Sequence, residues 1–286
     1  MDIRKALEQL DLLFDSRRID EVEGFLLSEI KSAEQEDDDT SIISLVNELI
    51  GFYRTAGRHK DAMVYCDYIV SLMRELNLEK TVPYATTLLN VATAYRAAGK
   101  AEDALEYYGD VLKIYEDSIP DSDMRLASLY NNMSLAYNEI KDYEKACLFL
   151  EKALSITVKN EDTEIEEATT HSNLATTLMR LNKMPEAVKH IEAALEIYES
   201  SDGPRDFHYS SALSVMGEVL FRLKDSEGAL EYYKRALNEI ESSMGKNSSY
   251  VSTCSNISFI YNRLGNKEEA EKYNNIAEEV SGSLNR

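Results

Sequence analysis

The 286-residue chain has only three Cys, four Pro and eleven Gly, no Trp, and no long run of apolar residues. The three cysteines, at positions 66, 147 and 254, are too few and too far apart to form a disulfide framework. Their scarcity indicates a protein of the reducing cytoplasm. The scarcity of Gly and Pro argues against all-β folds, which need many tight turns. No stretch approaches ~18 apolar residues, so we expect no membrane-spanning helix. We also expect no secretory signal, because the first residues lack a basic segment followed by an apolar one.

Basic residues are also scarce. Lys and Arg total 31 against 52 Asp and Glu, which gives a net charge of -21. A surface this acidic repels phosphate backbones, so nucleic acid is not an expected partner. Hydrophobic residues nevertheless make up 44 % of the chain, a globular proportion that excludes wholesale disorder. The composition therefore indicates a mostly helical protein of the cytoplasm.

An internal repeat organises most of the chain. The pentapeptide Ala-Leu-Glu-Tyr-Tyr occurs at residues 104–108 and again at 229–233, and its first Ala has counterparts 41 or 42 residues apart. Apolar residues recur at helical spacing before and after each such Ala, so each copy is predicted to form two helices. A degenerate copy is anchored by Val22. The six Ala anchors are Ala62, Ala104, Ala146, Ala187, Ala229 and Ala270.

The turn between the two helices of a copy carries residues suited to a left-handed backbone. Three copies place Gly57, Gly99 or Gly265 there. The others hold the dipeptides 141–142 (Lys-Asp), 182–183 (Asn-Lys) and 224–225 (Lys-Asp). We expect their Asn and Asp to adopt that conformation, less readily than Gly.

These features resemble the tetratricopeptide repeat, whose pattern places a small residue where the two helices approach most closely. That position holds Ala92, Ser134, Ala175, Gly217 and Ser258. The usual repeat has about 34 residues. Two features are similar to those of the kinesin light chain subgroup. One is the longer period, and the other is the segment 87–95 with the Gly-Lys and Ala-Leu that follow it.

The resemblance implies an all-α, right-handed superhelical solenoid of about seven antiparallel helix pairs. We expect residues 1–40 to form a degenerate N-terminal helix pair that caps the array. Residues 41–286 would hold six tandem repeats, the last acting as the C-terminal cap. Polar residues on its final helix suit such a cap: Asn274, Asn275, Glu278 and Glu279.

No catalytic or cofactor motif is present. The sequence contains no Gly-rich phosphate loop, no zinc-protease helix and no nucleophile elbow. The acidic segment 34–39 lacks the Gly and the distant Glu of a calcium loop, which indicates a solvated connector. His171 occupies a packing position of the repeat, and the cysteines are expected to be buried and unreactive. We therefore expect no enzyme activity, no cofactor and no metal.

The resemblance implies that the first helix of each pair lines a concave groove. The sixth residue of the repeat, which faces inward, is an Asn in four copies. Asn131 is the fifth residue of its copy, another inward position. Asn is a poor residue for a helix interior, so its recurrence calls for a reason. In kinesin light chain-like repeats and Rap-type receptors such asparagines hold the backbone of a bound peptide. The alternative is that they bond neighbouring helices to each other. The four residues are Asn90, Asn132, Asn173 and Asn256.

Arginines recur in the same groove near the end of each first helix. The inward positions hold five Arg and three Glu, so their charges sum to +2 in a chain whose net charge is -21. Such a stripe suits a peptide with acidic residues or a free carboxylate. The alternative is that the arginines pair with acidic side chains of adjacent helices. The candidates are Arg54, Arg96, Arg180, Arg222 and Arg263, with Phe221 and Phe259 adding apolar surface.

The Lys and Asn of the chaperone-type carboxylate clamp are absent from their positions in the repeat. We therefore expect a non-enzymatic scaffold that binds a protein or extended peptide in its groove. The alternative function is a receptor for a small signalling peptide, as in Rap-type regulators. The resemblance implies that those receptors carry an additional N-terminal helical bundle or DNA-binding domain, which we do not expect here because the seven copies cover nearly the whole sequence.

Overall fold

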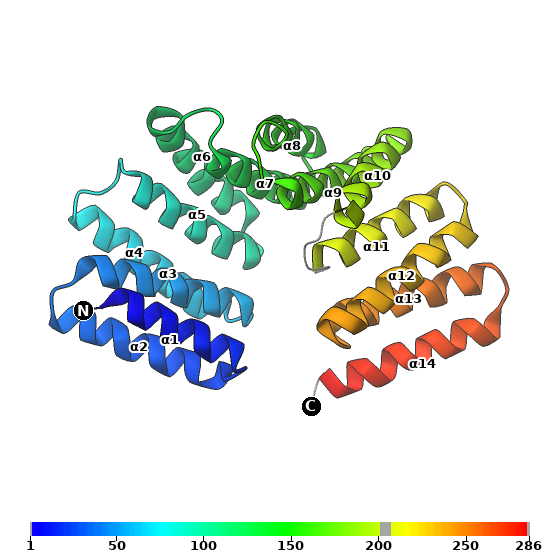
Figure 1. Cartoon of the computed structure of the whole chain (residues 1–286), viewed down its shortest axis with the longest axis horizontal. Coiled ribbons are helices and arrows are strands. Elements are labelled where there is room, and N and C mark those ends of the chain that lie inside the picture. The colour runs from blue at the N-terminus through cyan, green and yellow to red at the C-terminus, as the bar shows by residue number, and fades with distance from the viewer. Residues whose placement is uncertain (1, 201–206, 285–286) are drawn as a thin grey trace. The chain divides into compact units, whose positions relative to one another are not determined.

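Every regular element in the described residues, 2–200 and 207–284 of this computed structural model, is an α-helix. The helices follow the chain in seven consecutive pairs (Figure 1). Their bounds are α1 (Ile3–Asp15), α2 (Ile19–Gln35), α3 (Asp39–Thr55), α4 (His59–Glu75), α5 (Val82–Ala97), α6 (Ala101–Ser118), α7 (Met124–Glu139), α8 (Tyr143–Thr157), α9 (Glu164–Arg180), α10 (Met184–Ser200), α11 (Phe207–Arg222), α12 (Ser226–Met244), α13 (Ser248–Arg263) and α14 (Lys267–Leu284).

The turn inside every pair contains one left-handed residue at the same place in the repeat. Gly occupies it in three turns, as predicted. Two turns differ from our expectation, because Lys141 and Lys224 take the positive φ instead of the Asp that follows. Asp225 has another task, since its carboxylate accepts a hydrogen bond from the Gly228 N–H (2.9 Å) and caps α12. The left-handed residues are Arg17, Gly57, Gly99, Lys141, Asn182, Lys224 and Gly265.

The first compact unit, residues 1–142, contains α1 to α7. Within it α3 contacts α5, and α5 contacts α7, while α4 and α6 each pack against the odd-numbered helix before and after them. The anchors Val22, Ala62 and Ala104 are at most 1 % exposed. Such burial explains why the anchor is small, because a larger side chain would push the two helices of a pair apart.

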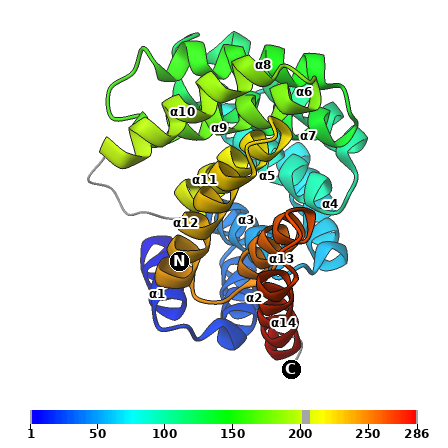
Figure 2. The ribbon, with the colours of Figure 1, turned by 90° about the vertical axis from the view of Figure 1, so that its right-hand side faces the viewer.

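The second compact unit, residues 143–286, contains α8 to α14. Its helices α11 and α12 lie side by side, as do α13 and α14 (Figure 2). All four anchors here are at most 2 % exposed: Ala146, Ala187, Ala229 and Ala270. The predicted close approach is visible at Gly217, where an added Cβ would lie 2.9 Å from the Tyr233 ring.

The all-α solenoid of helix pairs is confirmed. Residues 1–40 hold the pair α1 and α2, and the polar residues predicted for the last helix are exposed on α14. The assignment of these two pairs as caps stays a prediction.

Candidate functional site

All twelve predicted groove residues lie on odd-numbered helices. We call the surface of α3, α5 and α7 in the first unit, and of α9, α11 and α13 in the second, the odd-helix face. The first unit carries Arg54, Asn90, Arg96, Asn131 and Asn132, and the second carries Asn173, Arg180, Phe221, Arg222, Asn256, Phe259 and Arg263.

In the first unit the asparagines bond to the protein itself. Asn90 Nδ2 donates to Asn47 Oδ1 (2.8 Å), and Asn47 Nδ2 donates to Thr87 Oγ1 (3.1 Å), which ties α3 to α5. Asn131 and Asn132 each donate to a backbone carbonyl four residues earlier in α7. For Asn90 the structure thus shows the helix-to-helix bond that the sequence left open as an alternative.

The first unit also pairs one of its two groove arginines. Arg96 Nη1 donates to Glu139 Oε1 (2.6 Å), which joins α5 to α7, and the Arg96 side chain is only 21 % exposed. Arg54, on the last turn of α3, has no carboxylate within ion-pair distance in the part of the chain that the structure describes. The alternative of internal pairing therefore holds for Arg96 and not for Arg54.

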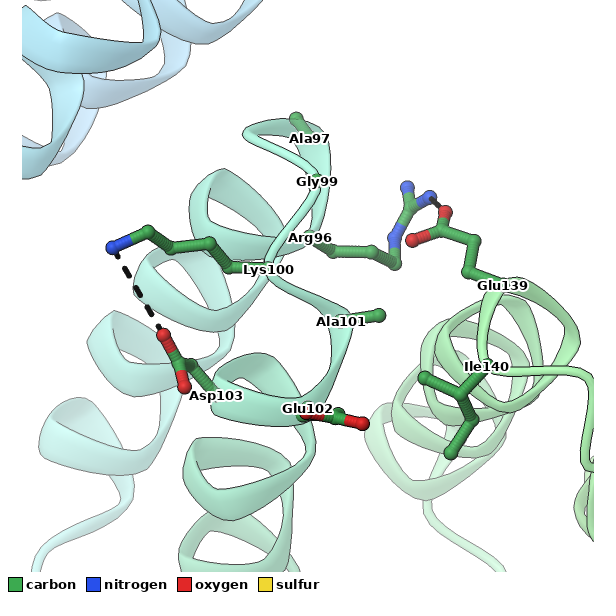
Figure 3. A pocket seen from close by; sticks show the side chains of 9 residues that line it. All are labelled: Arg96, Ala97, Gly99, Lys100, Ala101, Glu102, Asp103, Glu139 and Ile140. Atoms are coloured by element: carbon green, nitrogen blue, oxygen red, sulfur yellow. Dashed lines mark hydrogen bonds and ion pairs between the residues drawn. The ribbon is translucent and has the colours of Figure 1, made fainter.

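The Arg96–Glu139 pair lines an open pocket of about 980 Å³ between the α5–α6 turn and the end of α7 (Figure 3). Lys100 and Asp103 on the same wall form a second ion pair (4.0 Å). Both cations of the pocket already face a carboxylate and Glu102 adds a third acidic group, so the lining offers an anionic ligand no free cation.

The second unit leaves more of its odd-helix face unpaired. Arg222 Nη2 donates to Glu218 Oε1 one turn earlier (2.6 Å), and Arg222 Nη1 donates to the Met179 carbonyl of α9 (3.4 Å). Arg180 is exposed and, within the described residues, has no ion-pair partner. Of these two arginines, Arg222 is therefore paired and Arg180 is free.

Two aromatic rings of the second unit contact each other on α11 and α13. The Phe221 and Phe259 rings are 5.7 Å apart at 69°, an edge-to-face contact between α11 and α13. The Arg263 guanidinium lies over the Phe221 ring, 5.5 Å from its centroid. Phe259 is 55 % exposed. We call Phe221, Phe259 and Arg263 the cation–aromatic patch.

A smaller pocket of about 300 Å³ lies at the other end of α11 and α13. Four of its hydroxyls donate to carbonyls of their own helices, as Ser252 Oγ does to the Ser248 carbonyl (3.0 Å). The Asn256 amide has no such bond among the described residues, and it is exposed. Sequence reasoning missed four of the lining residues because they lie on first turns, outside the counted inward positions: Phe207, Ser210, Ser248 and Ser249.

Metal-binding side chains and thiols were the remaining candidates for chemistry in the described residues. No three His, Cys, Asp or Glu side chains there are grouped so that they could hold a metal ion. The free thiols are buried, and burial raises the pKa of Cys66 to about 12 and of Cys254 to about 11. They are therefore protonated and unreactive near neutral pH. None of the described helices is both long and apolar enough to cross a bilayer.

The sequence profile of the tetratricopeptide repeat family matches residues 40–117, 125–200, 166–238 and 209–281. The chain belongs to the tetratricopeptide repeat family. The resemblance to the kinesin light chain subgroup is confirmed, since the solved structures similar to this one include kinesin light chain-like repeats as well as Rap proteins.

Among its tetratricopeptide relatives is regulatory protein RapG of Bacillus subtilis (strain 168), 33 % identical over 114 residues. That match covers 40 % of this chain and 30 % of RapG, so the chain spans less than a third of that relative. The structure of BtubC (BKLC) from P. vanneervenii superposes with a TM-score of 0.66 at 21 % identity, covering 79 % of this chain and 92 % of that one. A Rap protein complexed with Competence and Sporulation Factor superposes with a TM-score of 0.68 at 15 % identity, covering 98 % and 76 %.

Proposed function

We propose that this tetratricopeptide repeat protein is a non-enzymatic interaction module that binds an extended peptide or protein segment on its odd-helix face. The observation that carries the proposal is the unpaired chemistry of the second unit. The Asn256 amide and the Arg180 guanidinium have no partner among the described residues, and both lie on this face. An Asn amide can donate to and accept from a peptide backbone at once, and a guanidinium fork matches a carboxylate.

Charge supports an anionic partner. The chain as a whole has a charge of -21, so an acidic ligand would be repelled by most of its surface. Cations kept on one face attract such a ligand to that face and suppress binding elsewhere. We therefore propose a partner with acidic residues or a free carboxylate, whose affinity falls as salt is added. Buried free thiols are compatible with our placement of the protein in the cytoplasm.

A second candidate function is a receptor for a small signalling peptide. Two observations favour it: the 33 % identity with RapG, and the superposition on a Rap protein complexed with Competence and Sporulation Factor. The two candidates differ in the size of the ligand. A signalling receptor binds a short free peptide fully, whereas a scaffold needs additional contacts from a larger partner.

The test is affinity selection with the whole chain. Immobilised protein would be incubated with synthetic random hexapeptides, and recovered peptides would be identified by mass spectrometry and titrated by fluorescence anisotropy. Asn256→Ala should weaken binding by about 1–3 kcal/mol, because a polar group of the ligand loses its partner. Arg180→Glu should weaken it more, because attraction becomes repulsion. Asn132 and Asn173 remain proposed backbone contacts, and their Ala variants belong to the same titration.

Lys189→Glu is the matched control for Arg180→Glu. It makes the same charge change in the same unit, on the exposed surface of the even-numbered helix α10. Binding to Lys189→Glu should equal binding to the wild type. Equal affinity for the wild type, Asn256→Ala and Arg180→Glu, with all three proteins folded, would mean that the ligand lies on another face.

A further inference from the structure

The pocket of about 300 Å³ between α11 and α13 is lined by ten residues, seven of which carry a hydroxyl. We call it the hydroxyl pocket, and we propose that it binds an uncharged amide side chain, Asn or Gln, of the peptide. This inference rests on the proposed function. It names a residue type that the odd-helix face selects in addition to the acidic group of the ligand.

The hydroxyl pocket exists because small residues occupy one half of a shared helix face. Ser252, Asn256 and Phe259 follow one another at spacings of four and three residues, so they lie along one face of α13. Toward the end of that face the Phe259 ring contacts the Phe221 ring of α11, with 5.7 Å between the centroids. Near its start the facing side chains are serines, which are too short to close the gap. The space between them reaches the buried Ile240 of α12.

The lining of the hydroxyl pocket carries no charge. Charged residues make up 29 % of the chain, so ten residues taken at that frequency would include about three. In the pocket of about 980 Å³ in the first unit, five of the nine lining residues are charged. A carboxylate or an ammonium that entered the hydroxyl pocket would lose water without gaining a counter-ion, so charged side chains are selected against. The first turns of the two helices favour an anion only weakly, and the net charge of -21 opposes that preference.

The hydroxyls supply both acceptors and donors. Four of them donate to a carbonyl of their own helix, as Ser214 Oγ does to the Ser210 carbonyl (3.0 Å). Such an oxygen keeps lone pairs with which it accepts a hydrogen bond from a ligand N–H. The Oγ atoms of Ser211, Ser248 and Ser249 have no hydrogen-bond partner among the described residues, so they can donate. A primary amide matches this lining, because it donates two N–H groups and accepts through one C=O.

The carbon atoms of an Asn or Gln side chain also find suitable surface. Ile240 is 2 % exposed and forms an apolar floor, and Phe207, 52 % exposed, lies at the rim. Asn256 is part of the same lining, and its amide is the contact proposed for the backbone of the peptide. The peptide residue that bonds to Asn256 therefore lies beside the hydroxyl pocket. Successive side chains of an extended peptide point to opposite faces, so only one of two neighbouring side chains enters.

The experiment offers a synthetic random hexapeptide library to the whole chain and identifies the recovered peptides by mass spectrometry. We expect Asn or Gln to be enriched at one position. In a recovered peptide that residue would then be replaced by the corresponding acid, Asp or Glu, which keeps the shape and adds a charge. Fluorescence anisotropy should show that the affinity falls by about 10-fold or more, because the charge has no counter-ion in the lining.

Ser252→Leu tests the pocket from the side of the protein. The larger side chain would occupy part of the pocket, and it should lower the affinity for the amide-containing peptide by about 10-fold. The same variant should have little effect on a peptide whose amide residue is replaced by Ala. Ser242→Leu is the matched control, because Ser242 is also exposed and also donates to a carbonyl of its own helix (3.1 Å). It lies on α12, outside the lining, and should leave the affinity unchanged.

The outcomes separate this inference from the proposed function. Recovered peptides with no preferred amide residue, or an acid-substituted peptide that binds as well as the amide, would overturn the inference and leave the proposed function standing. Equal effects of Ser252→Leu and Ser242→Leu would overturn the assignment to the hydroxyl pocket. Recovery of no peptide at all would contradict the proposed function, together with the inference that rests on it.

Discussion

The Nδ1 atoms of His171 and His190 lie 2.8 Å apart, where α9 packs against α10. The Nδ1–H of one ring must donate a hydrogen bond to the unprotonated Nδ1 of the other. The contact therefore holds one proton between these two atoms and is lost when both carry one. The rings are tilted by 37° with centroids 5.0 Å apart. Glu167 Oε1 lies 3.9 Å from His171 Nε2, and Glu151 of α8 raises the pKa of His190 against the larger, lowering effect of burial.

This contact predicts a loss of stability on acidification. Burial, and then the neighbouring His190, lower the pKa of His171 to about 4. An unfolded His titrates near 6.5, so between pH 6.5 and 4 the unfolded chain binds a proton that the folded chain does not. The free energy of unfolding therefore falls as the pH decreases through that window. By pH 5 the contribution lost should be about 1–2 kcal/mol.

The measurement is urea denaturation of the wild type and His171→Asn at pH 7.5 and pH 5. The stability difference between the two proteins should shrink at pH 5, because only the wild type carries His171, whose pKa is lowered to about 4. His208→Asn is the control, since His208 is exposed at the start of α11. A wild type to His171→Asn difference that is the same at both pH values would contradict the assignment.

The turns predict opposite effects of two substitutions at one place in the repeat. Lys224 and Gly99 both have positive φ, and that conformation costs a residue with a Cβ about 1–2 kcal/mol. Lys224→Gly should raise the melting temperature, and Gly99→Ala should lower it. Differential scanning calorimetry checks both, and a decrease for Lys224→Gly would show that the lysine side chain makes a compensating contact.

Ala146→Leu tests the buried anchors. Ala146 is 0 % exposed on α8, so a larger side chain should overpack the helices at a cost of about 1–3 kcal/mol. Leu148→Ala, on the same helix and 49 % exposed, is the control and should cost much less. Denaturant midpoints report both, and an unchanged midpoint for Ala146→Leu would mean that the anchor position is not tightly packed.

Gly217 and Tyr233 form a pair that a double-mutant cycle can resolve. Gly217→Ala alone should destabilise the protein, because its Cβ would meet the Tyr233 ring at 2.9 Å. A second substitution, Tyr233→Leu, should recover part of the loss, since a smaller side chain makes room for the methyl group. Additive effects of the two substitutions would show that the ring moves aside without cost.

The fold could be predicted because one repeated requirement, a small residue between two helices, recurs at the anchors, and each anchor is buried. The pairing of the groove side chains could not, because it depends on distances between successive repeats. Arg96 and Glu139 are 43 residues apart in the chain, and their side chains pair between α5 and α7. Arg222 and Glu218 are four residues apart, and that pair was accessible from the sequence through helical spacing alone. The left-handed Lys224 was missed because Asp225, the residue with the higher turn propensity, is used as a helix cap.

Within each unit, extensive packing joins only helices that are one or two places apart in the chain. Contact order is therefore low, which favours rapid folding and allows one helix pair to open while more distant pairs keep their packing. In the absence of ligand, amide hydrogens of α9 and α13 should exchange with water through separate openings, because no extensive packing connects these two helices. A peptide bound to both Arg180 and Asn256 would bridge α9 and α13, so the two openings would become a single event. The second unit would then gain a cooperativity that its own sequence does not supply.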